Sequence, residues 1–480
     1  MSLHMTVDVA RNAGESLTSQ IQRFIKREIA DGVLHPGTRL PSSRRLAGDL
    51  DVSRSVVVEA YEQLAAEGYL EAAAGSGTRV VGRPGHRRAA GPALLDEGPG
   101  GVRAAPAVRW DLRTGGDNVP DFPRREWLLC YQRVLGPAGP GARAGNGYPP
   151  LAGEPVLRAE LAGYLGRVRG VRTRADHVLV VSGFAQALAL LCTALARAQG
   201  VRDLALEDPG HPGQRRFVEA AGLQAVPVPV DEEGIDVDAL AASGARAVLV
   251  TPGHQFPTGA VLSARRREAL ARWARERDGW VIEDDYDAGL WYDRGAAPPA
   301  LQRLAPERVV YAGTVSKTLS PALRLGWLAA PERLFGPLLW ARERQDLGSD
   351  AFSQLALAEL LGSGLFDRHL RRLRERARER RTALDEAVRR ELPAARVLGP
   401  AAGLHAYVRL GRYVAEETLV AEALRGSVLV RGGSAYRFAP ERAQAPAVVV
   451  GHAHLPRDGV AEAVRVLGAA ARTARRVTRG

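Results

Sequence analysis

The chain has 480 residues, of which 46% are hydrophobic and 25% charged, the composition of an ordinary globular protein with room for roughly two to four domains. It contains no apolar run near the ~20 residues of a membrane span, no secretory leader, and no metal-ligand or disulfide spacing at its two cysteines, so we expect a cytoplasmic protein without bound metal. Its net charge of +12 is typical of a protein with a polyanionic partner, although a general preference for arginine explains the same charge.

Residues 14–82 are expected to form a small domain of three helices and a hairpin. Apolar residues recur at helical spacing from Leu17, Ser42 lies at the start of a second helical pattern, and Ser53 precedes a third. Residues 69–81 form a short strand pattern around a Gly-Ser-Gly tip, which indicates a hairpin. This order of elements predicts a winged helix-turn-helix domain.

Side chains at the start of the second and third helical patterns can contact DNA. A helix N-terminus in the major groove presents hydroxyl and guanidinium groups to phosphates and base edges, and glycines let a wing approach the minor groove. A small helical interaction module, in which the same residues act only as caps, is the alternative. The candidate DNA-binding residues are Arg44, Ser53, Arg54, Ser55, Gly75 and Gly77.

Four stretches of this zone resemble bacterial regulators of the GntR family. They are GTRLPSSRRLA at 37–47, VSRS at 52–55, AYEQLAAEGYL at 60–70 and GSGTRV at 75–80. The resemblance implies that the domain binds double-stranded operator DNA.

A linker and a larger α/β domain are expected after the first domain. Residues 83–108 are rich in glycine, proline, alanine and arginine without a sustained period, which is typical of a linker. From 109 to 475, β-branched runs alternate with helical patterns such as 185–198 and 264–277, so we expect an α/β domain with a mainly parallel sheet. The expected strands are 178–181, 204–206, 247–250, 280–282 and 309–311.

Lys317 is one of only two lysines in a chain with 66 basic residues, the other being Lys26. A lysine can lose its proton and act as a nucleophile or form a Schiff base, whereas an arginine stays charged. Taken alone, an isolated lysine is as often a solvated surface charge. The neighbouring motifs therefore decide its role.

Two further stretches suit a pyridoxal phosphate site around Lys317. The strand end in IEDDYD at 282–287 offers Asp284 as the anion beside a protonated ring nitrogen and Tyr286 as a donor near the ring oxygen. The strand–turn–helix pattern at 178–188 offers free N–H groups to a phosphate. Each pattern alone also has a plain structural interpretation, as a capping cluster or an ordinary strand–helix junction. The candidate phosphate-binding residues are Gly183, Phe184, Ala185, Ser316 and Arg324.

The order and spacing of three motifs resemble the fold-type I pyridoxal phosphate enzymes of the aspartate aminotransferase class. The motifs are TPGHQFPTG at 251–259, EDDYD at 283–287 and SKTLSPALRLG at 316–326. Together with the GntR-like domain, the whole chain resembles the MocR/GabR subfamily of transcriptional regulators. The resemblance implies a homodimer that binds pyridoxal 5'-phosphate and operator DNA, with pyridoxal phosphate or an amino compound as effector.

The resemblance also implies roles for single residues. Lys317 would be the Schiff-base lysine, Asp284 would contact the pyridine nitrogen, and Tyr286 would contact the ring oxygen. Tyr148 would reach a phosphate across the dimer interface. His211 stands where relatives carry a tyrosine stacked on the cofactor ring, and an imidazole can also stack.

One position departs from the aminotransferase pattern. Relatives hold the substrate carboxylate with an arginine in a late strand, where this chain has Val449. His452 or His454 could substitute if protonated, although a packed or solvated histidine is the plainer interpretation. Two functions stay open: a DNA-binding regulator that senses pyridoxal phosphate or an adduct of it, and an active aminotransferase with an attached DNA-binding domain. We expect the regulator, because the carboxylate clamp is missing and the N-terminal domain serves a purpose only if DNA is bound.

Overall fold

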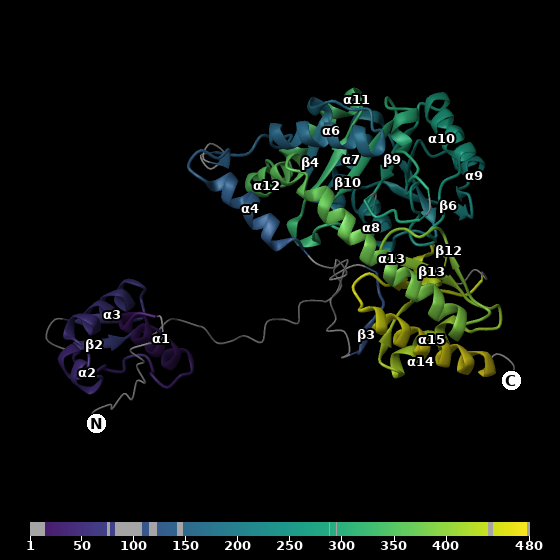
Figure 1. Cartoon of the computed structure of the whole chain (residues 1–480). Coiled ribbons are helices and arrows are strands. Elements are labelled where there is room, and N and C mark those ends of the chain that lie inside the picture. Colours follow the sequence, from purple (N-terminus) through teal and green to yellow (C-terminus); the bar gives the residue numbers. More distant parts are fainter. Residues whose placement is uncertain are drawn as a thin grey trace. The chain divides into compact units, whose positions relative to one another are not determined.

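A computed structural model of the chain divides it into two compact units, Met1–Val102 and Arg103–Gly480 (Figure 1). Most of the linker predicted at 83–108 lies outside the described residues, and its character stays a prediction. In the described part of the chain, no helix is long and apolar enough to cross a membrane. The structure describes residues 15–73, 77–81, 108–114, 122–141, 147–287, 289–293, 295–439 and 445–477.

The first unit is built from short helices and a two-stranded hairpin. Its elements are α1 (Leu17–Ala30), α2 (Ser43–Asp49), α3 (Arg54–Ala66), β1 (Leu70–Ala73) and β2 (Gly77–Val80). Ser16 and Ser42 each accept a hydrogen bond from a backbone N–H in the first turn of α1 and α2, which fixes where these helices begin. The predicted winged helix-turn-helix is confirmed, and its hairpin tip at 74–76, which includes Gly75, lies outside the described residues.

The second unit is organised around a large sheet. Its strands are β4 (Val178–Val181), β5 (Asp203–Asp208), β6 (Gln224–Asp231), β7 (Gly234–Ile235), β8 (Ala247–Val250), β9 (Trp280–Asp284), β10 (Val309–Thr314) and β11 (Gly326–Ala329). They follow the order β4-β11-β10-β9-β8-β5-β6-β7. The pairs from β10 to β6 are parallel, whereas β11, β4 and β7 join through antiparallel pairs. The predicted α/β domain with a mainly parallel sheet is therefore confirmed.

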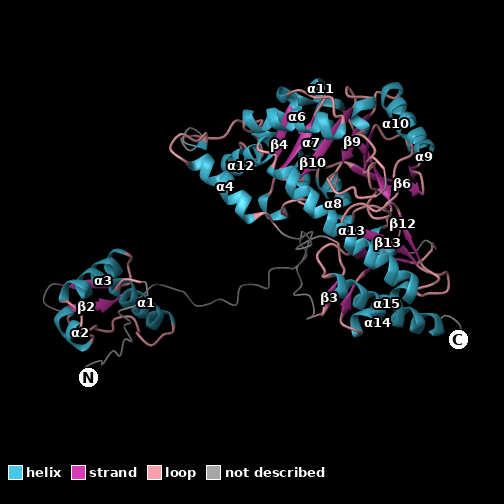
Figure 2. Cartoon of the chain, viewed as in Figure 1, coloured by secondary structure: helices cyan, strands magenta, loops and turns pink. Residues whose placement is uncertain are grey.

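Helices flank this sheet, as Figure 2 shows. They are α4 (Arg124–Leu135), α6 (Pro155–Arg169), α7 (Phe184–Gln199), α8 (Pro212–Ala220), α9 (Val237–Ala242), α10 (Ala264–Glu276), α11 (Glu332–Glu343) and α12 (Ala351–Gly362). In β4, Leu179 and Val181 pack in one cluster with α7 and α11, while Val178 and Val180 pack in another with α6 and α12. Because both faces are buried, the strands read as continuous apolar runs, and this makes them recognisable in the sequence.

A smaller sheet and three helices form the C-terminal part of this unit. The elements are β3 (Trp110–Asp111), α13 (Leu365–Glu391), β12 (Arg396–Leu398), β13 (His405–Arg409), α14 (Glu416–Arg425), β14 (Val428–Leu429), β15 (Arg431–Gly432), β16 (Ala447–Gly451) and α15 (Arg457–Val477). The antiparallel order is β12-β13-β16-β15, and β3 pairs in parallel with β14. In Figure 1, α13 runs from the large sheet to the small one. Of this second sheet, only the late strand that contains Val449 is anticipated, through the resemblance, and it is β16. Short 3₁₀ turns lie at Ala175–His177, Leu301–Leu304, Pro321–Leu323 and Gly433–Tyr436.

A buried ion pair lies behind the end of β9. Arg169 Nε donates to Asp285 Oδ2 over 2.7 Å, and both side chains are 4% exposed. The Tyr311 hydroxyl donates to the same oxygen over 2.8 Å. The neighbouring Asp284 differs, because it accepts one bond of 3.5 Å from Gln214 and its other oxygen has no hydrogen-bond partner among the described residues. Two adjacent carboxylates therefore have opposite surroundings.

We expect Asp285→Ala to destabilise the second unit by about 3–5 kcal/mol, because it leaves the buried charge of Arg169 without a partner. Asp284→Ala is the matched control and should cost less than about 1 kcal/mol, because a buried carboxylate without an ion pair contributes little stability. Calorimetric unfolding of both variants, dialysed to remove small ligands, measures the difference between their losses of stability. Equal shifts of the two unfolding midpoints would contradict this distinction.

Candidate functional site

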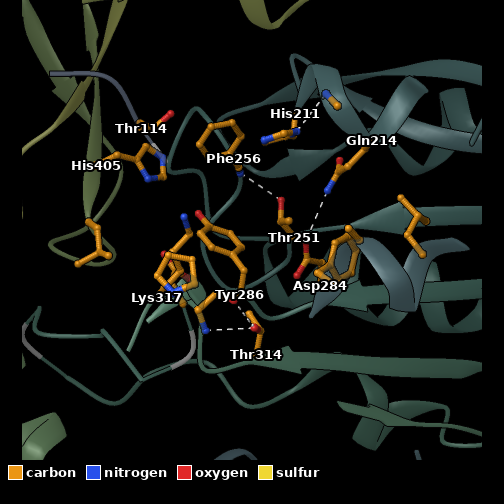
Figure 3. Close-up of a pocket in the computed structure, with 18 of the residues that line it drawn as sticks. Thr114, His211, Gln214, Thr251, Phe256, Asp284, Tyr286, Thr314, Lys317 and His405 are labelled. Carbon is orange, nitrogen blue, oxygen red and sulfur yellow. Dashed lines mark hydrogen bonds between the residues drawn. The ribbon is translucent and has the colours of Figure 1, made fainter. Parts of the chain in front are cut away.

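A cavity of about 330 Å³ lies where the parallel strands β5, β8, β9 and β10 end (Figure 3). Its wall includes one residue from the end of each strand or the turn after it: Glu207, Thr251, Asp284 and Thr314. Ligands of open α/β sheets bind at such strand ends, because the loops that follow the strands gather there. Several predicted site residues, far apart in sequence, meet in this cavity.

Lys317 lines the cavity from the turn after β10 and is half-buried. Burial lowers the pKa of its amine, while the negative charges of Asp287 and Asp284 act in the opposite direction. A lowered pKa raises the fraction of neutral amine at a given pH, and the neutral amine is the nucleophilic form. The geometry therefore suits Lys317 to a reaction with a carbonyl group.

Asp284 lines the same cavity and is 6% exposed. Burial raises the pKa of its carboxyl group well above the usual range, and the neighbouring carboxylates of Asp285, Asp287 and Glu207 raise it further. Its Oδ1 has no hydrogen-bond partner among the described residues. A buried polar atom without a partner is costly, so this oxygen fits a ligand that brings its own N–H donor, such as a protonated pyridine ring.

Tyr286 completes this side of the cavity. Its hydroxyl donates to the backbone carbonyl of His254 over 3.0 Å, and it lies 3.3 Å from His254 Nδ1. That ring nitrogen is 2.7 Å from Asp287 Oδ2. Burial raises the pKa of the Tyr286 phenol well above the usual range, so the hydroxyl stays protonated. It donates to a ligand oxygen only when that oxygen takes the place of the His254 carbonyl as acceptor.

The start of α7 offers an anion cradle. Gly183 precedes the helix with φ of 84°, and a Cβ added there would lie 3.0 Å from Arg324 Nη2. Arg324 Nη2 in turn donates to the Ser182 carbonyl over 2.6 Å. No side chain caps the first N–H groups of α7, where Phe184 and Ala185 line the cavity. Free N–H groups at a helix N-terminus beside a guanidinium are well placed to bind a phosphate.

Ser316 and His211 also lie where the sequence predicts a site. The Ser316 hydroxyl is 2.9 Å from the hydroxyl of Thr314, and the side chain lines the cavity. His211 begins α8 and accepts a hydrogen bond from the backbone of Gly213 over 3.1 Å. Burial lowers the pKa of His211 to about 4, with Lys317 contributing in the same direction. The imidazole is therefore uncharged at neutral pH, as stacking on an aromatic ring requires.

Other predicted residues lie away from the cavity. Tyr148 is 86% exposed and does not line it. Val449 is fully buried in β16. His452 is also fully buried, and burial lowers its pKa to about 3, so it carries no charge that could hold a carboxylate. His454 Nε2–H donates to the Asp111 carbonyl over 2.7 Å. Neither histidine takes the place of the arginine that is absent at 449.

Sequence reasoning missed several cavity residues. Thr114 follows β3, Gln214 lies in the first turn of α8, and His405 begins β13 (Figure 3). Glu207 Oε2 accepts hydrogen bonds from the backbone and hydroxyl of Thr251, and burial raises its pKa to about 7. Only two of these residues carry a signal in the sequence: Glu207 follows the predicted strand at 204–206, and Thr251 begins the motif at 251–259. Within the described residues, no cluster of side chains has the composition of a metal site.

The first unit presents its predicted DNA-binding residues on its surface. Arg44 and Arg54 are exposed, and neither forms an ion pair with a described carboxylate. The hydroxyls of Ser53 and Ser55 are 2.8 Å apart at the start of α3. Their groups are therefore available to a ligand.

The described end of the wing adds one residue that sequence reasoning missed. Gly77 has φ of 87°, and a Cβ added there would lie 2.9 Å from Arg39 Nε. Arg39 is exposed and lies beside β2 through a backbone bridge to Arg79. The exposed guanidinium of Arg39 thus stands next to the base of the wing.

Comparisons with known proteins identify both units. The sequence profile "Bacterial regulatory proteins, gntR family" matches residues 17–80, and "Aminotransferase class I and II" matches residues 141–465. The chain is similar to the HTH-type pyridoxine biosynthesis transcriptional regulator PdxR of Corynebacterium glutamicum, with 35% identity over 82% of this chain and 83% of that protein. It is also similar to the probable rhizopine catabolism regulatory protein MocR of Rhizobium meliloti, with 33% identity over 80% of this chain and 79% of that protein.

A solved structure shares the fold of the second unit. It is the α-aminoadipate aminotransferase LysN of Thermus thermophilus, complexed with N-(5'-phosphopyridoxyl)-L-leucine, with a TM-score of 0.68 and 29% identity. The likeness covers 77% of this chain and 94% of that one. The chain therefore belongs to the MocR-type transcriptional regulators, in which a GntR-family helix-turn-helix domain is fused to an aminotransferase-like domain of fold-type I.

Proposed function

We propose that this regulator binds operator DNA through residues 14–82 and pyridoxal 5'-phosphate through residues 109–475, and that the cofactor changes its affinity for the operator. The observation that carries the proposal is the unpaired, buried oxygen of Asp284 in the cavity that also contains Lys317. A carboxylate in that position is costly in an empty protein and useful beside a protonated ring nitrogen.

The described residues fit pyridoxal phosphate at each of its functional groups. Asp284 would hold the ring nitrogen, Tyr286 the ring oxygen, and His211 the face of the ring. The first N–H groups of α7 would hold the phosphate together with Ser316 and Arg324. When bound, pyridoxal phosphate would supply an aldehyde, and Lys317 would supply the amine that can condense with it.

A sensing role is supported by the missing carboxylate clamp. Of the residues that line the cavity, the only described arginine is Arg324, which lies at the phosphate end. The carboxylate of an ordinary α-amino acid therefore finds no guanidinium at position 449, which is a valine. The regulators named above are the one of pyridoxine biosynthesis and the probable rhizopine catabolism regulatory protein, which supports control of vitamin B6 or of amino-compound metabolism by this chain.

The alternative function is an active aminotransferase that also carries a DNA-binding domain. It is supported by 32% identity to the 2-aminoadipate transaminase of Thermus thermophilus over 74% of this chain. Release of a keto acid from an amino acid distinguishes this alternative from pure sensing.

A homodimer is part of the proposal. Several apolar side chains of α4 are solvent-exposed in the single chain, with Leu128 at 59% and Leu135 at 57%. Tyr148 is 86% exposed, and its ring would bury a large apolar surface against a partner chain. Exposed apolar side chains on one element favour an interface, and a dimer would bind an operator with two half-sites.

We expect the purified protein to be yellow and to lose its visible absorbance when Lys317 is replaced by Ala, because no other amine lies in the cavity's described wall. Borohydride reduction followed by peptide mapping should place the cofactor on the peptide that contains Lys317. Lys26→Ala is the matched control, because Lys26 pairs with Glu67 in the first unit. Labelling of the 317 peptide in the Lys317→Ala variant would show that the attachment site is wrong.

Operator binding should weaken steeply with salt and depend on the first unit. Arg54→Ala should lower affinity and reduce the slope of log affinity against log salt by about 1, because one phosphate contact is lost. Arg23→Ala, which removes a charge that pairs with Glu15 over 2.6 Å, is the control and should leave the slope unchanged. An unchanged slope and affinity for Arg54→Ala would exclude the placement of α3 on DNA.

Pyridoxal phosphate itself should change operator affinity, because a ligand shifts a regulator by its different affinities for two states. Cofactor-free protein is titrated with pyridoxal phosphate on a labelled operator, and the titration is repeated with common α-amino acids, which should add little. A strong shift by one α-amino acid with no effect of the cofactor would overturn the proposal.

A further inference from the structure

Three register partners in the small sheet share one face, which packs beside the cavity wall. Tyr407 of β13, Val449 of β16 and Arg431 of β15 are register partners in adjacent antiparallel strands. Partners in such a row point to the same face of a sheet. Val449 packs in a cluster with Tyr436 and Phe256, and Phe256 lines the cavity. The face that carries Arg431 is therefore the face that packs against Phe256 of the cavity wall.

Arg431 also acts on residues at the cavity's edge. Its guanidinium interacts with the Tyr436 hydroxyl, whose oxygen lies 3.3 Å from that of Thr114. Its charge is among those that lower the pKa of His211. Thr114 and His211 both line the cavity. Arg431 is exposed and forms no ion pair with a described carboxylate, so its charge is free for a ligand.

The polar groups around this wall favour an acidic ligand group. Burial raises the pKa of the Tyr436 phenol, so its hydroxyl remains a donor beside the guanidinium. His405 is neutral, because burial and the nearby His254 lower its pKa well below the usual value. A guanidinium next to a hydroxyl donor matches the two oxygens of a carboxylate.

We infer that Arg431 replaces the missing arginine of position 449 and holds the carboxylate of an amine effector, a role that rests on the proposed function. Adjacent strands lie about 4.8 Å apart, so this guanidinium starts one strand away from the family position. That displacement corresponds to roughly three carbon–carbon bonds. The effector is therefore an amino acid whose carboxylate lies several bonds beyond the α-position.

The test uses the full chain loaded with pyridoxal phosphate and calorimetric titration with alanine, 3-aminopropanoate and 5-aminopentanoate. We expect 5-aminopentanoate to bind more tightly than alanine, and Arg431→Gln to weaken it about 10- to 100-fold, as the loss of a charge-assisted contact predicts. Pentylamine, which has the same chain without the acid, should bind the variant and the parent equally. Arg409→Gln is the matched control, because it removes a charge from the same sheet where Arg409 pairs with Glu232.

A second experiment tests whether the preference for alanine can be restored. Val449→Arg should shift the preference toward alanine, because it returns a guanidinium to the family position. If that variant does not fold, Arg431→Gln alone decides the question. Alanine as the tightest ligand, or an unchanged affinity for 5-aminopentanoate in Arg431→Gln, would overturn the inference. Failure of the parent protein to take up pyridoxal phosphate would instead overturn the proposed function.

Discussion

The four carboxyl groups at the end of β9 determine how the site can bind a ligand. Glu283, Asp284, Asp285 and Asp287 lie within five residues and are all buried. Glu283 accepts two backbone hydrogen bonds of 2.8 Å, Asp285 is paired with a buried arginine, and Asp287 contacts a histidine. Asp284 alone in this group has a fully buried oxygen without a hydrogen-bond partner in the described structure. The fold thus compensates three carboxylates internally and leaves the fourth for a ligand.

The large sheet makes this arrangement possible. Its central strands are parallel and buried on both faces, so their carboxyl ends converge on one edge and the helices that follow begin there. The same edge therefore combines an acidic strand end, the N-terminus of α7 and the turn that carries Lys317. Opposite charges are kept apart: the phosphate end has Arg324 and free N–H groups, and the ring end has Asp284.

The sequence was sufficient for features with a local cause. Lys317, Asp284 and Gly183 could be predicted, because each belongs to a strand, turn or helix start that is continuous in the chain. Thr114 and His405 could not, because they reach the cavity from segments nearly 300 residues apart that carry no motif. Most of the small sheet escaped prediction for a related reason. Its strand β15 has two residues and β12 has three, too few for a recognisable period.

Position 449 also shows what the sequence alone does not reveal. The absence of an arginine there is visible in the sequence. That Arg431 is its partner in the neighbouring strand is not visible, because the register between β15 and β16 is set by the tertiary structure. His452 and His454 lie near position 449 in sequence, but neither lines the cavity, in agreement with the plainer interpretation of each as a packed or solvated histidine.

The pairing of β3 with β14 has a mechanical consequence. The Leu112 N–H donates to the Leu429 carbonyl over 2.7 Å, and the Gly451 N–H donates to the Leu112 carbonyl over 2.7 Å. The segment that follows the linker is thus hydrogen-bonded to both β14 and β16, and its partner Leu429 lies two residues before Arg431. Any tilt of the small sheet against the large one therefore also moves the point at which this segment is attached.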